Sequence, residues 1–312
     1  MSTSSKNQIV GAVVAILLLT GGAWVVTRTR QPVPARNQKN TQGAGAFSAD
    51  TKELSEATSS VPVALKNGDT YDLTASIVRK NINGQPVKML AYNGSIPGPL
   101  IKVKKGSEIT VNFTNRTDVE TTIHSHGVRV ANAFDGTPDL TQKPVPVGGA
   151  FTYTLRFPDE GAYWYHPHVR EDYAQELGLY GMFFVESDSP NYWSLVNKEV
   201  PLILDDILLE NEQIAPFNRD GADRTLMGRF GNIMLVNGET NARLQAKQGE
   251  VLRFYLLNAA NTRTFNMRIP GVRMKLVGGD GGRYERETFV ESVMLGPSER
   301  AVVEALFEDP GT

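Results

Sequence analysis

One stretch of the sequence decides the fold class, and it reads Leu100-Ile101-Lys102-Val103-Lys104-Lys105-Gly106-Ser107-Glu108-Ile109-Thr110-Val111-Asn112-Phe113-Thr114-Asn115. Apolar and polar residues alternate from Glu108 to Phe113, which is typical of a β-strand with one buried face. The same alternation appears in residues 71–77 and 151–157, and turn residues such as Asn-Gly, Pro-Gly-Pro and Lys-Lys-Gly separate these segments. Short alternating segments between such turns predict an all-β fold built of sandwiches.

The same stretch recurs in the second half of the chain. Asn93-Gly94 precedes the first copy and Asn237-Gly238 precedes the second, and both copies contain a Lys-x-Gly turn and end at an asparagine. Shared turn chemistry would explain isolated matches, but several matches in the same order favour a true repeat. Residues 187–191 are polar and contain a proline, which indicates a break between domains. We therefore predict two tandem β-sandwiches, over residues 61–187 and 199–312.

The composition excludes several classes of protein. The chain has 312 residues, with 32 Lys and Arg against 34 Asp and Glu, and a formal net charge of -2. This balance excludes a strongly basic protein that binds nucleic acid by neutralising phosphates, so we predict no nucleic-acid partner. The sequence also contains no cysteine. Disulfides, thiolate nucleophiles, cysteine-ligated zinc and iron–sulfur clusters are therefore excluded.

The N-terminal region is first apolar and then polar. The run from Ile9 to Val26 carries no charge, and its length is close to the ~18 residues of a candidate membrane-spanning helix. We predict an uncleaved transmembrane anchor within residues 1–30; the alternative is a cleaved signal peptide, which usually has a shorter apolar core. Residues 31–60 are polar without periodicity, which predicts a flexible linker. Basic residues follow the apolar run more than they precede it, and this alone favours a cytoplasmic location for the rest of the chain.

All four histidines of the chain lie in two short motifs, His124-Ser125-His126 and His166-Pro167-His168. Residues i and i+2 of a strand point to the same face, so each motif presents two imidazoles side by side. Both motifs follow strand-like segments, and neighbouring strands would bring the four imidazoles to one patch. Imidazole suits copper, zinc, nickel and iron, and four histidines could also close a structural zinc site. The pattern therefore predicts a metal site and leaves the metal open.

The sequence around these motifs resembles the first cupredoxin domain of the multicopper oxidases. The resemblance rests on residues 93–99, on His124-Ser125-His126-Gly127, on Trp164-Tyr165-His166-Pro167-His168, and on residues 178–186. Residues 204–206, 235–238 and 295–300 are similar to parts of the second domain of that family. The resemblance spans roughly residues 60 to 312. It implies two tandem cupredoxin-like Greek-key sandwiches.

The resemblance also implies a function and a set of ligands. In this family three copper ions form a cluster that reduces dioxygen to water, with electrons from a donor such as a phenol or a metal ion. His124 would bind the type 2 copper, and His126, His166 and His168 would bind the type 3 pair. Asp135 resembles the outer carboxylate that helps to deliver protons, a role that suits a reaction which consumes them. The alternative for Asp135 is an ordinary turn residue before Gly136.

The sequence departs from the family pattern in one respect. The family's type 1 copper needs a cysteine, and this chain has neither a cysteine nor a fifth histidine. We therefore expect the N-terminal part of an oxidase, with half of the trinuclear site, a truncated second domain and no turnover alone. The alternative is a non-catalytic protein that binds or carries copper. Because the family works outside the cytoplasm, we expect a membrane-anchored, extracytoplasmic location in spite of the flanking charges.

Overall fold

The computed structural model describes residues 49–217, 224 and 226–309. The predicted anchor and most of the predicted linker lie outside these residues. Within the described ranges, no helix is both long enough and apolar enough to cross a membrane. Nearly all of the regular structure there is β-strand, so the predicted all-β class is confirmed.

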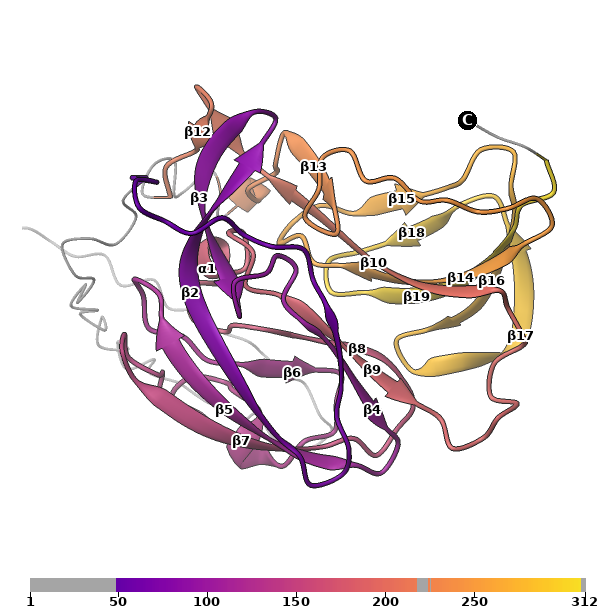
Figure 1. Ribbon diagram of the computed structural model, residues 1–312, viewed down its shortest axis with the longest axis horizontal. Helices are drawn as coiled ribbons and strands as arrows, with labels where there is room; N and C mark the ends of the chain where they lie inside the picture. Colours follow the sequence, from indigo (N-terminus) through magenta and orange to yellow (C-terminus); the bar gives the residue numbers. More distant parts are fainter. Residues whose placement is uncertain (1–48, 218–223, 225, 310–312) are drawn as a thin grey trace, which may run out of the picture. The chain divides into compact units, whose positions relative to one another are not determined.

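The first sandwich consists of a four-stranded and a five-stranded sheet (Figure 1). The four-stranded sheet has the order β3-β2-β5-β7 and contains β2 (Thr70–Ile82), β3 (Gln85–Tyr92), β5 (Glu108–Arg116) and β7 (Ala150–Arg156). The five-stranded sheet has the order β1-β4-β9-β8-β6 and contains β1 (Pro62–Ala64), β4 (Leu100–Lys104), β6 (His124–His126), β8 (Gly161–His166) and β9 (Gly181–Glu186). Two short helical turns, η1 (Asn132–Phe134) and α1 (Glu171–Ala174), lie in the loops.

The second sandwich is built around a six-stranded sheet with the order β13-β10-β14-β19-β16-β17. Its strands are β10 (Lys198–Ile207), β13 (Ile233–Val236), β14 (Val251–Asn258), β16 (Arg273–Gly279), β17 (Gly282–Val290) and β19 (Arg300–Leu306). Two small two-stranded sheets accompany it, formed by β15 (Phe265–Met267) with β18 (Val293–Leu295) and by β11 (Leu209–Glu210) with β12 (Gln213–Ile214).

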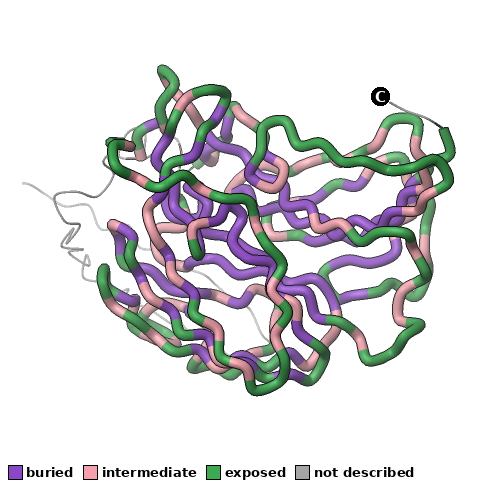
Figure 2. The backbone as a smooth tube through the Cα atoms, in the orientation of Figure 1, coloured by how far each residue is buried: buried purple, intermediate pink, exposed green. Residues whose placement is uncertain are grey.

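The alternating stretch over residues 100–115 forms β4 and most of β5. Every second residue of β5 is buried, including Ile109, Val111 and Phe113. Across the sandwich, the rings of Tyr92 in β3 and Tyr165 in β8 have centroids 5.2 Å apart. Figure 2 shows buried residues along the central strands of both sandwiches and exposed residues mainly in the loops. The alternation therefore supplies one apolar face per sheet, and the two faces close on each other.

The internal repeat is visible as repeated strand pairing. In the first sandwich β2 pairs in parallel with β5, which pairs antiparallel with β7. In the second, β10 pairs in parallel with β14, which pairs antiparallel with β19. The two Asn-Gly turns also match. Asn93 has a φ of 49° and accepts a hydrogen bond from the Thr74 amide at 2.7 Å, while Asn237 has a φ of 51° and accepts one from the Ile203 amide at 2.8 Å.

The asparagines near the end of β5 and at the end of β14 make equivalent hydrogen bonds. Asn115 is fully buried, and its Nδ2 donates to the carbonyl groups of Val119 and Val145 at 2.8 and 3.0 Å. Asn258 is also fully buried and donates to the carbonyl groups of Arg263 and Leu295 at 2.7 and 3.0 Å. Each amide side chain therefore satisfies backbone groups where a strand ends inside the core.

The first sheet begins earlier than the sequence analysis suggested. The sequence predicts a flexible linker up to residue 60, but Glu56 and Thr58 form bridges with Arg79 and Ser95. The Arg79 guanidinium also pairs with the Glu56 carboxylate at 2.9 Å. Polar residues without periodicity can follow the edge of a sheet when backbone groups provide the bonds, and this pattern is not visible in the sequence.

The two sandwiches contact each other through buried side chains. Phe184 of β9 and Tyr255 of β14 meet edge to face, with ring centroids 4.6 Å apart. Near α1, Gln175 donates to the Ala259 carbonyl at 2.9 Å, and Asn261 donates to the Glu171 carbonyl at 3.2 Å. The second sandwich therefore holds the segment that follows the second histidine motif.

Candidate metal centre

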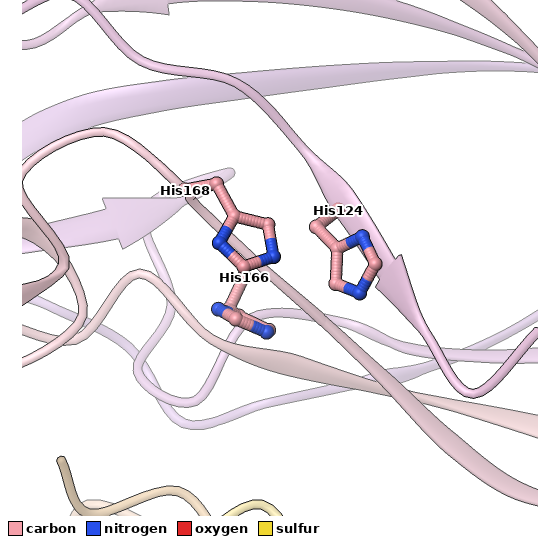
Figure 3. A group of neighbouring side chains, drawn as sticks. All are labelled: His124, His166 and His168. Atoms are coloured by element: carbon pink, nitrogen blue, oxygen red, sulfur yellow. The ribbon is translucent and has the colours of Figure 1, made fainter. Parts of the chain in front are cut away.

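The two histidine motifs lie on neighbouring strands. β6 pairs antiparallel with β8, and His124 lies opposite His166 in the register. His126 ends β6, and His168 follows β8 by two residues. Figure 3 shows the rings of His124, His166 and His168 gathered in one place. The structure thus brings together all four histidines that the sequence singles out.

The four imidazoles are close enough to share a site. The ring centroids of His124 and His168 lie 4.4 Å apart, and those of His124 and His166 lie 5.4 Å apart. One ligand atom from each of these three residues lies within 4.8 Å of the others. His126 joins them through its Nδ1, which is 3.4 Å from Nε2 of His166. Two imidazole nitrogens bound to one metal at ~2.0–2.1 Å are about 3.3 Å apart at a tetrahedral angle, so this pair fits a shared ion.

Backbone carbonyl groups and a carboxylate fix the ring orientations. Nδ1 of His124 lies 2.7 Å from the carbonyl oxygen of Asp135, and Nδ1 of His166 lies 3.0 Å from that of Pro167. Nδ1 of His168 is hydrogen-bonded to the Glu171 carboxylate. A carbonyl or carboxylate oxygen only accepts, so each of these Nδ1 atoms carries the proton. Nε2 is then the ring nitrogen available to a metal ion in all three residues, which is the usual arrangement of metal-binding histidines.

The environment keeps three of the imidazoles neutral. Burial lowers the pKa of His124 and lowers the pKa of His166 well below its ordinary value. Burial, helped by the positive charge of Arg300, lowers the pKa of His126 to about 4. Only a neutral imidazole binds a metal ion. These side chains are therefore in the binding form at pH 7.

Trp164 forms the floor of the site. Its indole stacks on His166 with ring centroids 3.9 Å apart and an interplanar angle of 15°. It also lies 5.3 Å from the ring centroid of His126. Trp164 is completely buried. Trp164 therefore packs directly against two of the histidines.

Asp135 lies beside His124, immediately after η1. Its carboxylate Oδ1 is 3.5 Å from Nδ1 of His124, and Oδ2 accepts a hydrogen bond from the Thr137 hydroxyl at 2.7 Å. The closer contact to the ring is made by the Asp135 backbone carbonyl. The following Gly136 has a φ of +78°, so the turn interpretation also describes this position. Proton delivery by Asp135 stays a prediction.

Glu171 contacts the ring of His168, a role that its place in the sequence does not indicate. The sequence favours surface charges at both Glu171 and Asp172, and Asp172 does pair with the partly exposed Arg170 at 2.7 Å. Glu171 instead binds the His168 ring. Arg170 adopts a left-handed conformation with a φ of 48°, which turns the chain back toward His168. Sequence spacing alone does not reveal such a turn at a non-glycine residue.

Glu171→Gln should weaken metal binding at His168. The carboxylate orients the ring and raises the electron density on Nε2, and loss of such a partner typically costs about 10–100-fold in metal affinity. Asp172→Asn is the matched control, because it removes the neighbouring acid and leaves His168 untouched. Competition titration of both variants with a chromophoric copper chelator measures the effect. Equal affinities for the two variants would show that Glu171 has no role in binding.

Comparison with known proteins agrees with the geometry of the site. Two family models, both described as multicopper oxidase, match residues 75–190 and 186–310. Together they cover most of the chain, in the order first sandwich and then second sandwich. The chain belongs to the multicopper oxidase family, and copper is therefore the metal that its family implies.

Individual relatives carry the same names. The chain is 32% identical over 219 residues to multicopper oxidase mco of Staphylococcus haemolyticus, a match that covers 68% of this chain and 47% of the relative. It is 32% identical over 260 residues to multicopper oxidase MmcO of Mycobacterium tuberculosis, covering 74% and 50%. The crystal structure of a multi-copper oxidase from Pseudomonas thermotolerans superposes with a TM-score of 0.72 at 30% identity, covering 80% of this chain and 60% of that one. The chain spans about half the length of the curated relatives.

Proposed function

We propose that this chain supplies the histidine-rich half of the copper site of an oxidase that couples substrate oxidation to the reduction of dioxygen to water. One observation carries the proposal: four imidazoles converge, and in three of them an oxygen partner fixes Nδ1 and leaves Nε2 as the atom available to a metal ion. A structural zinc site would use the same ligands, but the relatives are named as copper oxidases. Those names also favour an oxidase over a copper carrier.

The individual roles belong to this proposal. His124 would hold the type 2 copper, and His126, His166 and His168 would hold the type 3 pair. Copper bound there would supply the one-electron redox chemistry that reduction of dioxygen needs. Asp135 would hold a proton close to His124, since its carboxylate already lies 3.5 Å from Nδ1 of that ring. The type 1 copper and the contact with a phenolic or metal-ion donor would come from residues other than those of this chain, which contains no cysteine.

We propose a membrane-anchored, extracytoplasmic location for the same protein. The support is the apolar run from Ile9 to Val26 together with the membership of the family. A reporter enzyme that works only outside the cytoplasm, fused after residue 48, should be active. Activity of a cytoplasm-only reporter at the same position would reverse the assignment.

Copper titration of the chain tests the proposed site. We expect copper to be bound by nitrogen ligands with an electron paramagnetic resonance spectrum typical of imidazole, and without the intense blue absorption that needs a cysteine thiolate. A variant with alanine at all four histidine positions should lose this binding. Two results would contradict the proposal. One is tight copper binding that persists in the variant, and the other is a wild-type chain that binds zinc but does not bind copper.

A further inference from the structure

One arginine of the second sandwich contacts β8 and the residue that directly follows β6. Arg300 begins β19, and its Nε donates to the carbonyl group of Ala162 in β8 at 3.2 Å. Its Nη2 lies against Gly127, where an added Cβ atom would be only 2.6 Å away. Gly127 directly follows His126 at the end of β6. Arg300 is therefore placed to hold the ends of β6 and β8 together.

β6 needs support of this kind. It has three residues and lies at the edge of its sheet, and in the described part of the chain only β8 pairs with it. A short edge strand has few backbone hydrogen bonds of its own, so contacts from other elements contribute much of what fixes its C-terminal end. His126 lies at that end. Its Nδ1 must keep the distance of 3.4 Å to His166 if the two rings are to share an ion.

Arg300 is itself held rigidly. Its side chain is 4% exposed, and Nη1 lies 3.0 Å from both the Ser298 carbonyl oxygen and the Asp280 carboxylate. Nη2 also donates to the Asp280 carbonyl at 3.2 Å. The planar guanidinium uses its fixed fork of donors on several partners at once, which a lysine ammonium cannot reproduce.

The guanidinium also brings a buried positive charge to the site. Its carboxylate partner Asp280 is about half exposed, with a side-chain exposure of 53%, so solvent screens the partner more than it screens Arg300. Charges in a partly buried environment interact more strongly than they do in water. A second positive charge near His126 is therefore less favourable than it would be without Arg300.

We propose that Arg300 is a positioning residue of the histidine site, which fixes His126 against His166 and makes the site favour the singly charged over the doubly charged copper ion. The positioning role of Arg300 is supported by its contacts alone. Its effect on the choice of copper ion rests on the proposed copper site. Docking of the second sandwich would then affect the site directly, because Arg300 of that sandwich fixes the position of His126, a ligand that belongs to the first sandwich.

Two Arg300 variants and one control separate these roles. Arg300→Lys keeps the charge and loses the fork, whereas Arg300→Gln loses both. Arg253→Gln is the matched control. It removes another buried arginine of the same sheet, whose carboxylate partners Glu199 and Glu304 both lie in the second sandwich.

The first measurement uses the full metal-free chain. Nitrogen-15 NMR of the imidazole rings should show shifted and broadened His126 signals in both Arg300 variants, with His124 little changed, and a wild-type spectrum in Arg253→Gln. Thermal unfolding of each variant reports loss of stability separately. Unaltered His126 signals in Arg300→Lys, or the same change in Arg253→Gln, would overturn the positioning role.

The second measurement compares the affinities for Cu(I) and Cu(II) by competition with selective chelators. In Arg300→Gln the ratio of Cu(I) to Cu(II) affinity should fall about tenfold, the order expected for removing one charge near a partly buried site. Arg300→Lys should keep the wild-type ratio. An unchanged ratio in Arg300→Gln would overturn the charge role. Failure of the wild-type chain to bind copper would remove the proposed function and the charge role, and the metal-free NMR result would still decide the positioning role.

Discussion

Replacing Gly136 with alanine should destabilise the folded chain by about 3–4 kcal/mol, because it combines a left-handed backbone with overpacking. Gly136 has a φ of +78°. A Cβ atom there would lie 2.0 Å from the carbonyl oxygen of Ile123 and 2.9 Å from the amide nitrogen of His124. Both are backbone atoms at the start of β6, so no side-chain rotation can relieve the clash. The same shift would move the Asp135 carbonyl away from the His124 ring.

Gly148→Ala is the matched control for this prediction. Gly148 has a φ of +77°, almost the same as that of Gly136, but no described atom lies within 4 Å of its added Cβ. The free energy of unfolding of this variant should fall by only about 1 kcal/mol, the cost of a non-glycine residue in the left-handed conformation. Chemical denaturation of both variants measures the difference in their free energies of unfolding, provided that the slope of free energy against denaturant concentration is the same for both. Equal losses of stability in the two variants would show that the backbone around Gly136 can move to accommodate the Cβ atom, and that the clash costs little.

Trp164→Ala should cost about 3–5 kcal/mol of stability and should also weaken copper binding. The indole is completely buried, and it is the largest such side chain in the described part of the protein. Its removal leaves a cavity beneath His166, whose ring then loses the stacking surface 3.9 Å away. A ligand that can tilt must be reordered when the metal binds, and this ordering reduces affinity.

Trp164→Phe separates packing from hydrogen bonding. Among the described residues, Nε1 of Trp164 has no hydrogen-bond partner. Phenylalanine therefore gives up no hydrogen bond and keeps an aromatic surface for His166, so the loss should stay near 1–2 kcal/mol. Thermal unfolding with and without copper measures both variants. A phenylalanine variant as unstable as the alanine variant would indicate that the indole nitrogen has a partner that matters.

The sequence predicts the features of this protein that depend on local pattern. Alternation identifies strands such as β5, and the spacing of His124 and His126 places two imidazoles on one face because the strand repeat is two residues. The pairing of β6 with β8 follows once both motifs are assigned to neighbouring strands. The aligned asparagines Asn115 and Asn258 indicate the repeat, and their equivalent hydrogen bonds explain why the same residue occurs twice.

Contacts that depend on an unusual turn or on the docking of distant segments are not predictable in this way. Glu171 reaches His168 because Arg170 adopts a left-handed turn, which its sequence does not favour. Arg300 reaches Gly127 only after two sandwiches have docked, and no periodicity connects residues so far apart. The edge pairing of Glu56 and Thr58 uses backbone groups that every residue possesses. Such features require the packed structure.

The second sandwich contacts the surroundings of the histidine site at two points. Arg300 lies beside the segment that carries His126, and Asn261 donates a hydrogen bond to the Glu171 carbonyl. These contacts would link the binding of a metal ion to the docking of the two sandwiches, provided that the docked arrangement binds the ion more tightly. An ion at one hundred times its dissociation constant adds about 2.7 kcal/mol to whichever state binds it. If the docked arrangement is that state, the ion strengthens an interface where it makes no contact. The supply of copper would then also control the structure, since the interface between the two sandwiches would be most stable in molecules that have bound the metal.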